Sequence, residues 1–217
     1  MKNVKVLILL FFIPLFINAA NWHIGSDIGY RTGLFFQAKG TVNNFAQDFP
    51  LQIRLAISYN STDPGKAWAA RQIFINDNQN GTPEKAGWFW DARLDFIYPV
   101  HWLSLKREYF YAGPRYYWFT GRFDFVGGNE DFDVYSDSWG IGAGLEAHFA
   151  MSNKIDFILG AGLDYYITDH MHGHDTTYYS DGEADNGREG YSYDDADDAI
   201  NQPKLVPTIS IGINYQL

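Results

Sequence analysis

Five segments of the chain alternate between large apolar residues and small or polar ones. Across 49–59 the odd positions are Phe, Leu, Ile, Leu, Ile and Tyr, whereas the even positions are Pro, Gln, Arg, Ala and Ser. The same period of two runs through 88–98, 138–149, 155–167 and 205–217. Successive side chains of a strand point to opposite faces, so each segment predicts a strand with one apolar and one polar face.

Three further segments, 22–30, 34–42 and 108–125, are less regular but also favour strands. The connections alternate between short ones, such as 43–48, 99–107 and 150–154, and long polar ones at about 61–85, 126–137 and 168–202. Eight strands with short turns at one end and long loops at the other predict an all-β fold, an eight-stranded antiparallel up-and-down transmembrane β-barrel. In the first long loop, Asp63 and Pro64 indicate the start of a helical turn over 66–71.

The first twenty residues have the three parts of a secretory signal. Lys2 and Lys5 precede an apolar run from Val6 to Ile17, and Asn18, Ala19 and Ala20 offer small residues for cleavage. The run is shorter than the roughly 20 apolar residues that a membrane-spanning helix needs. We therefore expect a cleaved signal peptide over 1–20 and one barrel domain over 21–217.

Alternation alone does not tell which face of the strands lies outside. The polar face holds glycines and charges of both signs, and an eight-stranded barrel has an interior just wide enough for side chains. Isolated buried charges must be paired, which favours ion pairs filling the lumen over a catalytic cluster there. The predicted salt-bridge network of the lumen comprises Arg54, Asp91, Arg93, Asp95, Arg115, Glu146, Asp156 and Asp164.

The apolar face has aromatic residues at the strand ends and aliphatic residues at the centres. Trp22, Tyr98 and Phe149 mark strand ends, while Leu55 and Ile211 lie in strand centres. Trp and Tyr prefer the headgroup level of a bilayer, so this pattern indicates two girdles around a lipid-facing band. A soluble, lipocalin-like binder of a small apolar ligand, with the apolar face inside, is the alternative.

With these features the chain resembles the small bacterial outer-membrane β-barrel proteins of the OmpA/OmpX-like class. The resemblance rests on the signal sequence, the glycine-rich segments 139–146 and 160–165, and the closing strand that ends at Leu217. It implies a location in the bacterial outer membrane, contact with outer-membrane lipids, and recognition by the outer-membrane assembly machinery. Such families usually end in Phe or Trp, and Leu217 departs from that pattern, although Ile213 and Tyr215 keep the rest.

Composition narrows the function. The 26 acidic residues outnumber the 16 Lys and Arg, giving a formal net charge of −10, which disfavours nucleic acid as a partner. The chain has no cysteine, so disulfides, Cys-ligated metals and thiol catalysis are excluded.

The longest loop carries two candidate metal-binding groups. His170, His172 and His174 would share one face of an extended segment and suit Zn²⁺ or Cu²⁺. Asp181, Glu183 and Asp185 resemble part of a calcium loop, but the glycine comes one position late and the closing Glu is missing. Hydrated His-rich and acidic loops are the favoured interpretation, with a loop-bound divalent cation as the alternative and no other cofactor expected.

No catalytic constellation stands out. The close His–Ser pairs, His101 with Ser104 and His148 with Ser152, lack an evident orienting acid and lie at the short-turn end. We therefore expect a non-enzymatic barrel with a structural, surface-interaction or ligand-binding role that displays acidic extracellular loops to an unknown surface ligand. A lipid-modifying outer-membrane enzyme is the alternative.

Overall fold

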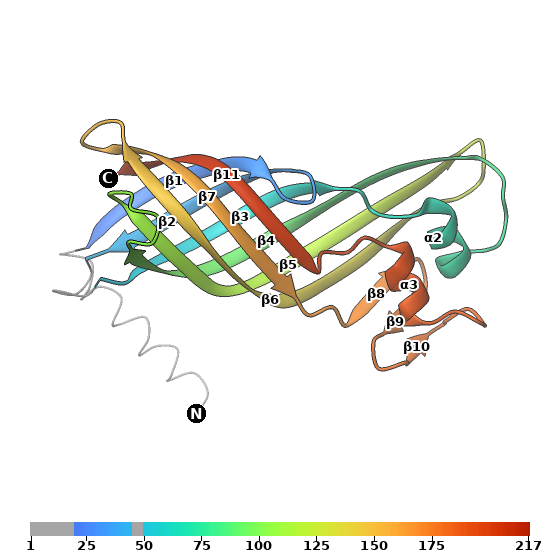
Figure 1. Ribbon diagram of the computed structural model, residues 1–217. Helices are drawn as coiled ribbons and strands as arrows, with labels where there is room; N and C mark the ends of the chain where they lie inside the picture. Colours follow the sequence, from blue (N-terminus) through green and yellow to red (C-terminus); the bar gives the residue numbers. More distant parts are fainter. Residues whose placement is uncertain (1–19, 45–49) are drawn as a thin grey trace, which may run out of the picture.

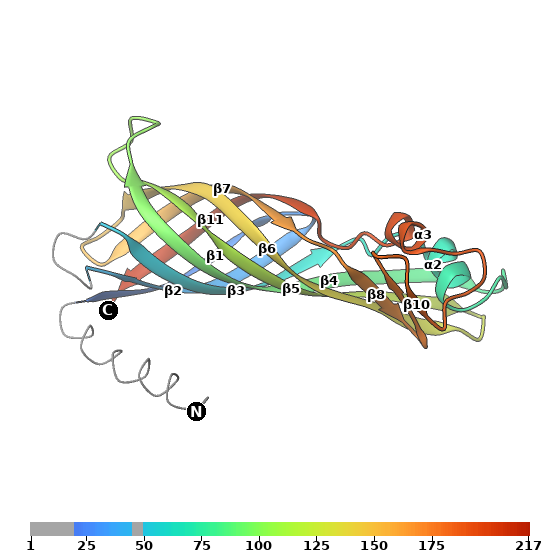
Figure 2. The ribbon, with the colours of Figure 1, turned by 90° about the horizontal axis from the view of Figure 1, so that it is seen from below.

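A computed structural model describes residues 20–44 and 50–217, so the expected signal peptide lies outside the described residues except for Ala20. Within the described part, eight strands close into an antiparallel barrel (Figures 1 and 2). They are β1 (Asn21–Tyr30), β2 (Leu34–Asn43), β3 (Gln52–Thr62), β4 (Thr82–Val100), β5 (Glu108–Val126), β6 (Asp131–Ala150), β7 (Ile155–Tyr166) and β11 (Leu205–Gln216). The predicted fold class is confirmed.

The barrel closes through the last strand of the chain. Strands β1 to β7 pair in chain order, β7 pairs with β11, and β11 pairs with β1 from His23 opposite Gln216 to Tyr30 opposite Ile209. The turns that follow β4 and β6 lie at the end where the C-terminus is found, called here the turn end (Figure 1). The opposite end, where the long connections lie, is called the loop end.

The apolar face of the strands lies outside. Leu55 is 66% exposed and Ile209 is 72% exposed, whereas Arg54, next to Leu55, is 2% exposed. The soluble alternative required an apolar interior, but the described strands enclose a polar one. The reason lies in the side-chain alternation: turning the apolar face inward would leave the charged partners of the lumen on the outside.

Three strands are much longer than the others. Strands β4, β5 and β6 have 19, 19 and 20 residues, against 10 to 12 in the other barrel strands, and they project beyond the barrel at the loop end (Figure 1). Residues 82–85, 126 and 131–137, expected within long loops, therefore belong to these strands, and residues 61–62 belong to the end of β3. The alternation continues through them, but their outward face is polar, which gave these segments the composition of loops.

Short elements pack against this projection. They are α2 (Ala67–Phe74), β8 (His170–Gly173), β9 (Thr176–Tyr179), β10 (Ala184–Asp185) and α3 (Tyr193–Ala199), and β8 continues the sheet from the edge of β6. We call these elements, with the projecting ends of β4–β6, the head. Across the described residues, no helix is long and apolar enough to span a membrane.

The helix expected after Asp63 begins later than the sequence indicated. Helix α2 starts at Ala67 with Lys66 as its N-cap, and no side chain caps it. The Asp63 carboxylate instead accepts a hydrogen bond from the Gly65 backbone N–H at 2.9 Å. Gly65 has a φ of 121°, a conformation that separates Asp63 and Pro64 from the helix.

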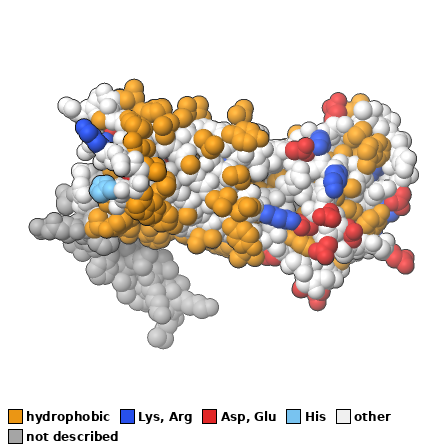
Figure 3. Space-filling view, in the orientation of Figure 1, with side chains coloured by type: hydrophobic (Ala, Val, Ile, Leu, Met, Phe, Trp, Pro, Cys, Tyr) orange, Lys and Arg blue, Asp and Glu red, His pale blue; other side chains and the backbone are white. Residues whose placement is uncertain are grey.

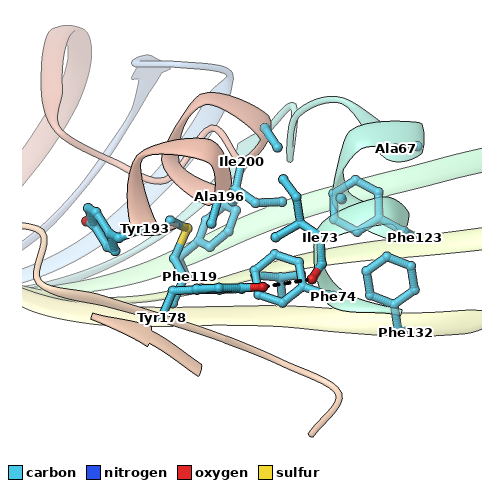
Figure 4. Close-up of a cluster of buried hydrophobic side chains, with 14 of the residues drawn as sticks. Ala67, Ile73, Phe74, Phe119, Phe123, Phe132, Tyr178, Tyr193, Ala196 and Ile200 are labelled. Carbon is cyan, nitrogen blue, oxygen red and sulfur yellow. Dashed lines mark hydrogen bonds between the residues drawn. The ribbon is translucent and has the colours of Figure 1, made fainter. Parts of the chain in front are cut away.

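The head has a hydrophobic core of its own (Figure 4). Phe123 and Phe132, from β5 and β6, stack with ring centroids 5.4 Å apart, and Phe74 of α2 packs edge-on to Tyr178 of β9. Ala196 and Ile200 close the core from the side of α3. These residues are buried, so the head is a packed unit of the kind found in water-soluble domains.

Candidate functional site

The lumen is filled by charged side chains that meet across it. Arg115 of β5 donates from Nε to Asp164 of β7 at 3.0 Å, and Arg93 of β4 donates to the same carboxylate at 2.8 Å. The guanidinium of Arg93 also lies 3.2 Å from Asp91. These four residues were predicted as members of a lumen network, and the structure brings them together.

The network continues toward the turn end. Arg54 of β3 contacts Asp95 at 2.8 Å and Glu146 of β6 at 2.5 Å, while Arg115 reaches the other Asp95 oxygen at 2.7 Å. Arg54 also lies over the ring of Tyr111. A continuous series of ion pairs therefore connects β3, β4, β5, β6 and β7.

Arg31 belongs to this network and was not predicted. It sits between β1 and β2, is 2% exposed, and donates to Asp91, Ser58 and Asn60 at 3.1 Å each. Tyr166 adds a hydrogen bond to Asp91 at 2.9 Å. Arg31 follows the predicted strand 22–30 and continues its series of odd, inward positions, and this spacing is the signal that could have found it.

A second cluster lies between β1 and β2. The Lys39 ammonium contacts Asp27 at 2.7 Å, and Gln37 donates to the other Asp27 oxygen at 2.8 Å. Both charged residues occupy inward positions of two of the three less regular predicted strands and were missed for that reason. In the described lumen five buried cations face five buried anions: Arg31, Lys39, Arg54, Arg93 and Arg115 against Asp27, Asp91, Asp95, Glu146 and Asp164.

Asp156 was predicted in the lumen network, and it lies at the turn-end rim of the lumen. It forms a bidentate pair with Arg107 at 2.6 and 2.8 Å, and the Arg107 side chain is 40% exposed. His148 lies beside it, 3.8 Å from Asp156 and 3.3 Å from Glu146. Asp156 follows the turn after β6 by a few residues, which places it at the rim and not at the centre.

The two faces of the long strands exchange polarity at one level. On β5 the outward side chains change from Tyr116 and Trp118 to Thr120, Arg122 and Asp124, while the inward ones change from Arg115 to Phe119, Phe123 and Phe125. On β6 the outward series changes between Trp139 and Asp137, and the inward series runs through Phe132 and Val134. Figure 3 shows the result: apolar side chains cover the barrel, and charged ones gather on the head.

This exchange marks a boundary between two surroundings. From Trp118 and Trp139 toward the turn end, the outside is apolar and the inside is charged, as in a strand facing lipid. From the same two residues toward the loop end, the outside is charged and the inside forms the aromatic core of the head, as in a strand facing water. The aromatic row formed by Tyr59, Trp90 and Trp118, which are paired across adjacent strands, lies at this boundary.

The head is held by polar contacts as well as by its core. Arg188 donates to the backbone oxygen of Gln72 and to Asp77, and Arg71 binds both the backbone and the side chain of Asn80 at 2.7 Å. The Tyr178 hydroxyl donates to the backbone oxygen of Ile73 at 3.1 Å, and burial raises the pKa of this hydroxyl (Figure 4). The long connections are thus tied to one another.

The predicted metal residues are not gathered into a site. His170 pairs with Asp169 and Asp137, His172 contacts the Thr177 hydroxyl at 2.9 Å, and His174 lies beside Asp175 in the turn that follows β8. The carboxylates of Asp181, Glu183 and Asp185 are exposed, and Asp185 accepts from Tyr179. Within residues 20–44 and 50–217, no three His, Asp or Glu side chains are grouped to hold a metal ion.

The candidate catalytic histidines lie at the turn end. His101 and Ser104 are both exposed in the turn between β4 and β5, and His148 is oriented toward Glu146 and Tyr109. Neither arrangement joins a histidine to a serine by a hydrogen bond among the described residues.

A concave surface at the loop end has the polar groups of a small binding site. It encloses about 320 Å³ between the turn after β1 and the segment that enters β11, and its lining includes Thr32, Thr62, Asn201 and Lys204. Asp63 and Asp197 flank it, each paired with a lysine.

Comparison with known proteins supports the fold. No family model and no curated protein matches the sequence. Among solved structures, a major outer membrane protein from Thermus thermophilus matches with a TM-score of 0.74 at 20% identity, covering 92% of this chain and 100% of that chain. Neisserial surface protein A (NspA) is matched over 92% of this chain and 98% of its own, at 11% identity and a TM-score of 0.40. The chain has the fold of an outer-membrane β-barrel protein.

Proposed function

We propose that the protein is a non-enzymatic outer-membrane barrel that anchors a rigid acidic head at the cell surface for contact with an external partner. The observation that carries this proposal is the exchange of polarity at Trp118 and Trp139. A lipid boundary at that level accounts for an apolar exterior below it and a charged exterior above it. The cleaved signal peptide and the outer-membrane location belong to the same proposal.

The filled lumen argues against a role as a pore. Each of its buried charges has a partner at 2.5 to 3.1 Å, as for Arg54 with Glu146 and Arg31 with Asp91. Opening a water-filled path would separate these pairs inside a narrow eight-stranded barrel. The barrel therefore acts as an anchor.

The head offers the surface for contact. Its exposed acidic side chains include Asp77, Glu84, Asp124, Asp131, Asp169, Asp175, Asp181, Glu183, Asp185, Glu189, Asp194, Asp195 and Asp198. Such a surface attracts cationic partners over the range of a Debye length. The concave surface lined by Thr32, Thr62 and Asn201, beside the head, is a further place for a small polar ligand.

Cysteine labelling tests which end of the barrel faces the cell exterior. The chain has no native cysteine, so only the introduced residue is labelled. Glu183→Cys lies on the head and Asn153→Cys lies in the turn between β6 and β7, both at exposed positions. A membrane-impermeant maleimide added to intact cells should label the first variant and should label the second only after the outer membrane is opened. The reverse result would overturn the orientation.

Two further measurements test the anchor. The protein should fractionate with the outer membrane and migrate faster in SDS gels before boiling than after, as a closed barrel does. In planar bilayers it should give no steady porin-like conductance. A soluble periplasmic protein without a heat shift would refute the membrane location, and a steady open channel would refute the closed lumen.

A further inference from the structure

The lipid-facing wall of the barrel has a groove that lies outside both the lumen and the head. It encloses about 680 Å³ on the outer side of strands β3 to β6. Leu55 and Leu94 form its aliphatic side, and Tyr116, Trp118 and Trp139 form its aromatic side. A volume of this size lies within the range of ordinary ligand sites.

The groove exists because its floor is made of small outward side chains at an interruption of the sheet. Ala92 lies between the outward residues Trp90 and Leu94 of β4. Pro114 of β5 is followed on the same face by Tyr116 and Trp118. The pairing of β4 with β5 is interrupted at this level, between the pairs Arg93–Arg115 and Phe96–Ala112. Proline has no N–H to give to a ladder, so it is normally kept out of central strands.

The rim of the groove is fixed in place. Tyr116 packs edge-on against Trp118 and Trp139, with ring centroids 4.9 and 5.0 Å apart, and its hydroxyl donates to Asp137. These rings lie at the polarity boundary next to the head. The groove therefore opens along the half of the lipid band nearest the head, and its aromatic end is at the headgroup level.

The charged residues that line the groove determine which part of a lipid it can bind. Arg93 and Arg115 contribute to the lining, but their guanidinium groups are paired with Asp91, Asp95 and Asp164. They offer no free positive charge to a carboxylate inside the groove. An uncharged hydrocarbon chain is the complementary occupant, with its headgroup outside the aromatic rim.

We propose that the groove binds one acyl chain of a lipid from the outer leaflet of the membrane. This inference rests on the proposed outer-membrane location. The occupant comes from the lipid that already surrounds the wall, since the groove is continuous with the exposed apolar band. Small residues on the floor of the groove and rigid rings at its rim would hold this acyl chain in place, whereas the lipid around the rest of the barrel stays mobile.

The test is to count lipids retained by the protein after extraction of outer membranes in a mild detergent, using native mass spectrometry. Wild type should carry a single bound lipid. In Ala92→Phe the added ring fills the floor, and the retained lipid should fall about tenfold. The matched control is Ala161→Phe, which adds the same ring at an outward position of β7, away from the groove, and should retain lipid as wild type does.

Each outcome decides the proposal. Heat-shifted mobility in SDS gels verifies that each variant forms a barrel. If Ala92→Phe forms no barrel, Leu94→Trp is used to fill the groove instead. Wild type without bound lipid, or equal retention in the filling variant and in Ala161→Phe, overturns the groove while leaving the outer-membrane location intact. Failure of the protein to fractionate with the outer membrane refutes the location separately.

Discussion

Arg54 and Glu146 lie 92 residues apart in the sequence and meet across the lumen at 2.5 Å. Their strands, β3 and β6, are not neighbours in the sheet, so this contact spans the barrel. It joins the β3–β4 wall, where Arg54 also binds Asp95, to the opposite wall. The pair is one of the contacts that make the lumen a solid core.

Breaking this pair should be much more harmful than removing it whole. Arg54→Leu leaves Glu146 buried without its main partner, and we expect a loss of about 3–5 kcal/mol in the free energy of unfolding. Urea titration in lipid vesicles measures it. The double variant Arg54→Leu with Glu146→Leu should regain much of the loss, and a double variant as unstable as the single one would contradict the account.

Lys85 and Asp63 provide the surface counterpart of that experiment. Their ion pair is 2.7 Å long, but the two side chains are 40% and 60% exposed. Lys85→Ala should therefore change the unfolding free energy by no more than about 1 kcal/mol. A loss comparable to that of Arg54→Leu would mean that this contact, and not the lumen, controls stability.

Gly113 should tolerate no side chain, whereas Gly40 should. A Cβ at Gly113 would lie 1.9 Å from the Leu94 backbone oxygen, at the interruption of the β4–β5 pairing. Nothing lies within 4 Å of a Cβ at Gly40. Gly113→Ala should lower the temperature at which the SDS-gel heat shift occurs, and Gly40→Ala should leave it unchanged or raise it. Equal temperatures for the two variants would refute this close approach.

The head should unfold without the barrel when its core is opened. Phe123 is fully buried, and Phe123→Ala removes a ring from the stack with Phe132 at a cost of about 3–5 kcal/mol. Limited proteolysis should then cut within 168–202 while the SDS-gel heat shift of the barrel persists. Val126→Ala, at an exposed position of the same strand, is the control and should remain resistant.

Helix α3 should lose stability in acid. Hydrogen bonds from the Ser192 hydroxyl and backbone N–H to the Asp195 carboxylate lower the pKa of Asp195 below its ordinary value. A group with a lowered pKa in the folded state stabilises it above the unfolded-state pKa of about 3.9 and loses that effect as the pH falls through the folded-state pKa. The protection factors for amide exchange at Ala196 and Ile200, which compare the measured rate with the intrinsic rate at each pH, should therefore fall below about pH 4.

Asp195→Asn isolates this effect from the other carboxylates of the head. The amide cannot titrate, so the protection factors at Ala196 and Ile200 should change little with pH over the same range. If the variant and wild type keep the same acid response, another carboxylate controls the helix.

The sequence by itself determined the barrel. A period of two over five segments, with three less regular ones, specifies two-faced strands, because a one-residue shift would reverse every side chain. The charges of both signs on one face favoured a polar lumen over an apolar one. The strand count and the inward positions of Arg54, Arg93 and Asp164 follow from that local rule.

Only the tertiary structure decided which partners meet and where the two faces of the long strands exchange polarity. The contact of Arg54 with Glu146 depends on the closure of β11 onto β1, which no local pattern encodes. The sequence did not predict the head, because its strands keep the same alternation with the two faces exchanged. Buried residues such as Phe123 and Phe132 alternate there with exposed acidic residues. Whether such a face is buried depends on α2 and α3, which reach it from distant parts of the chain.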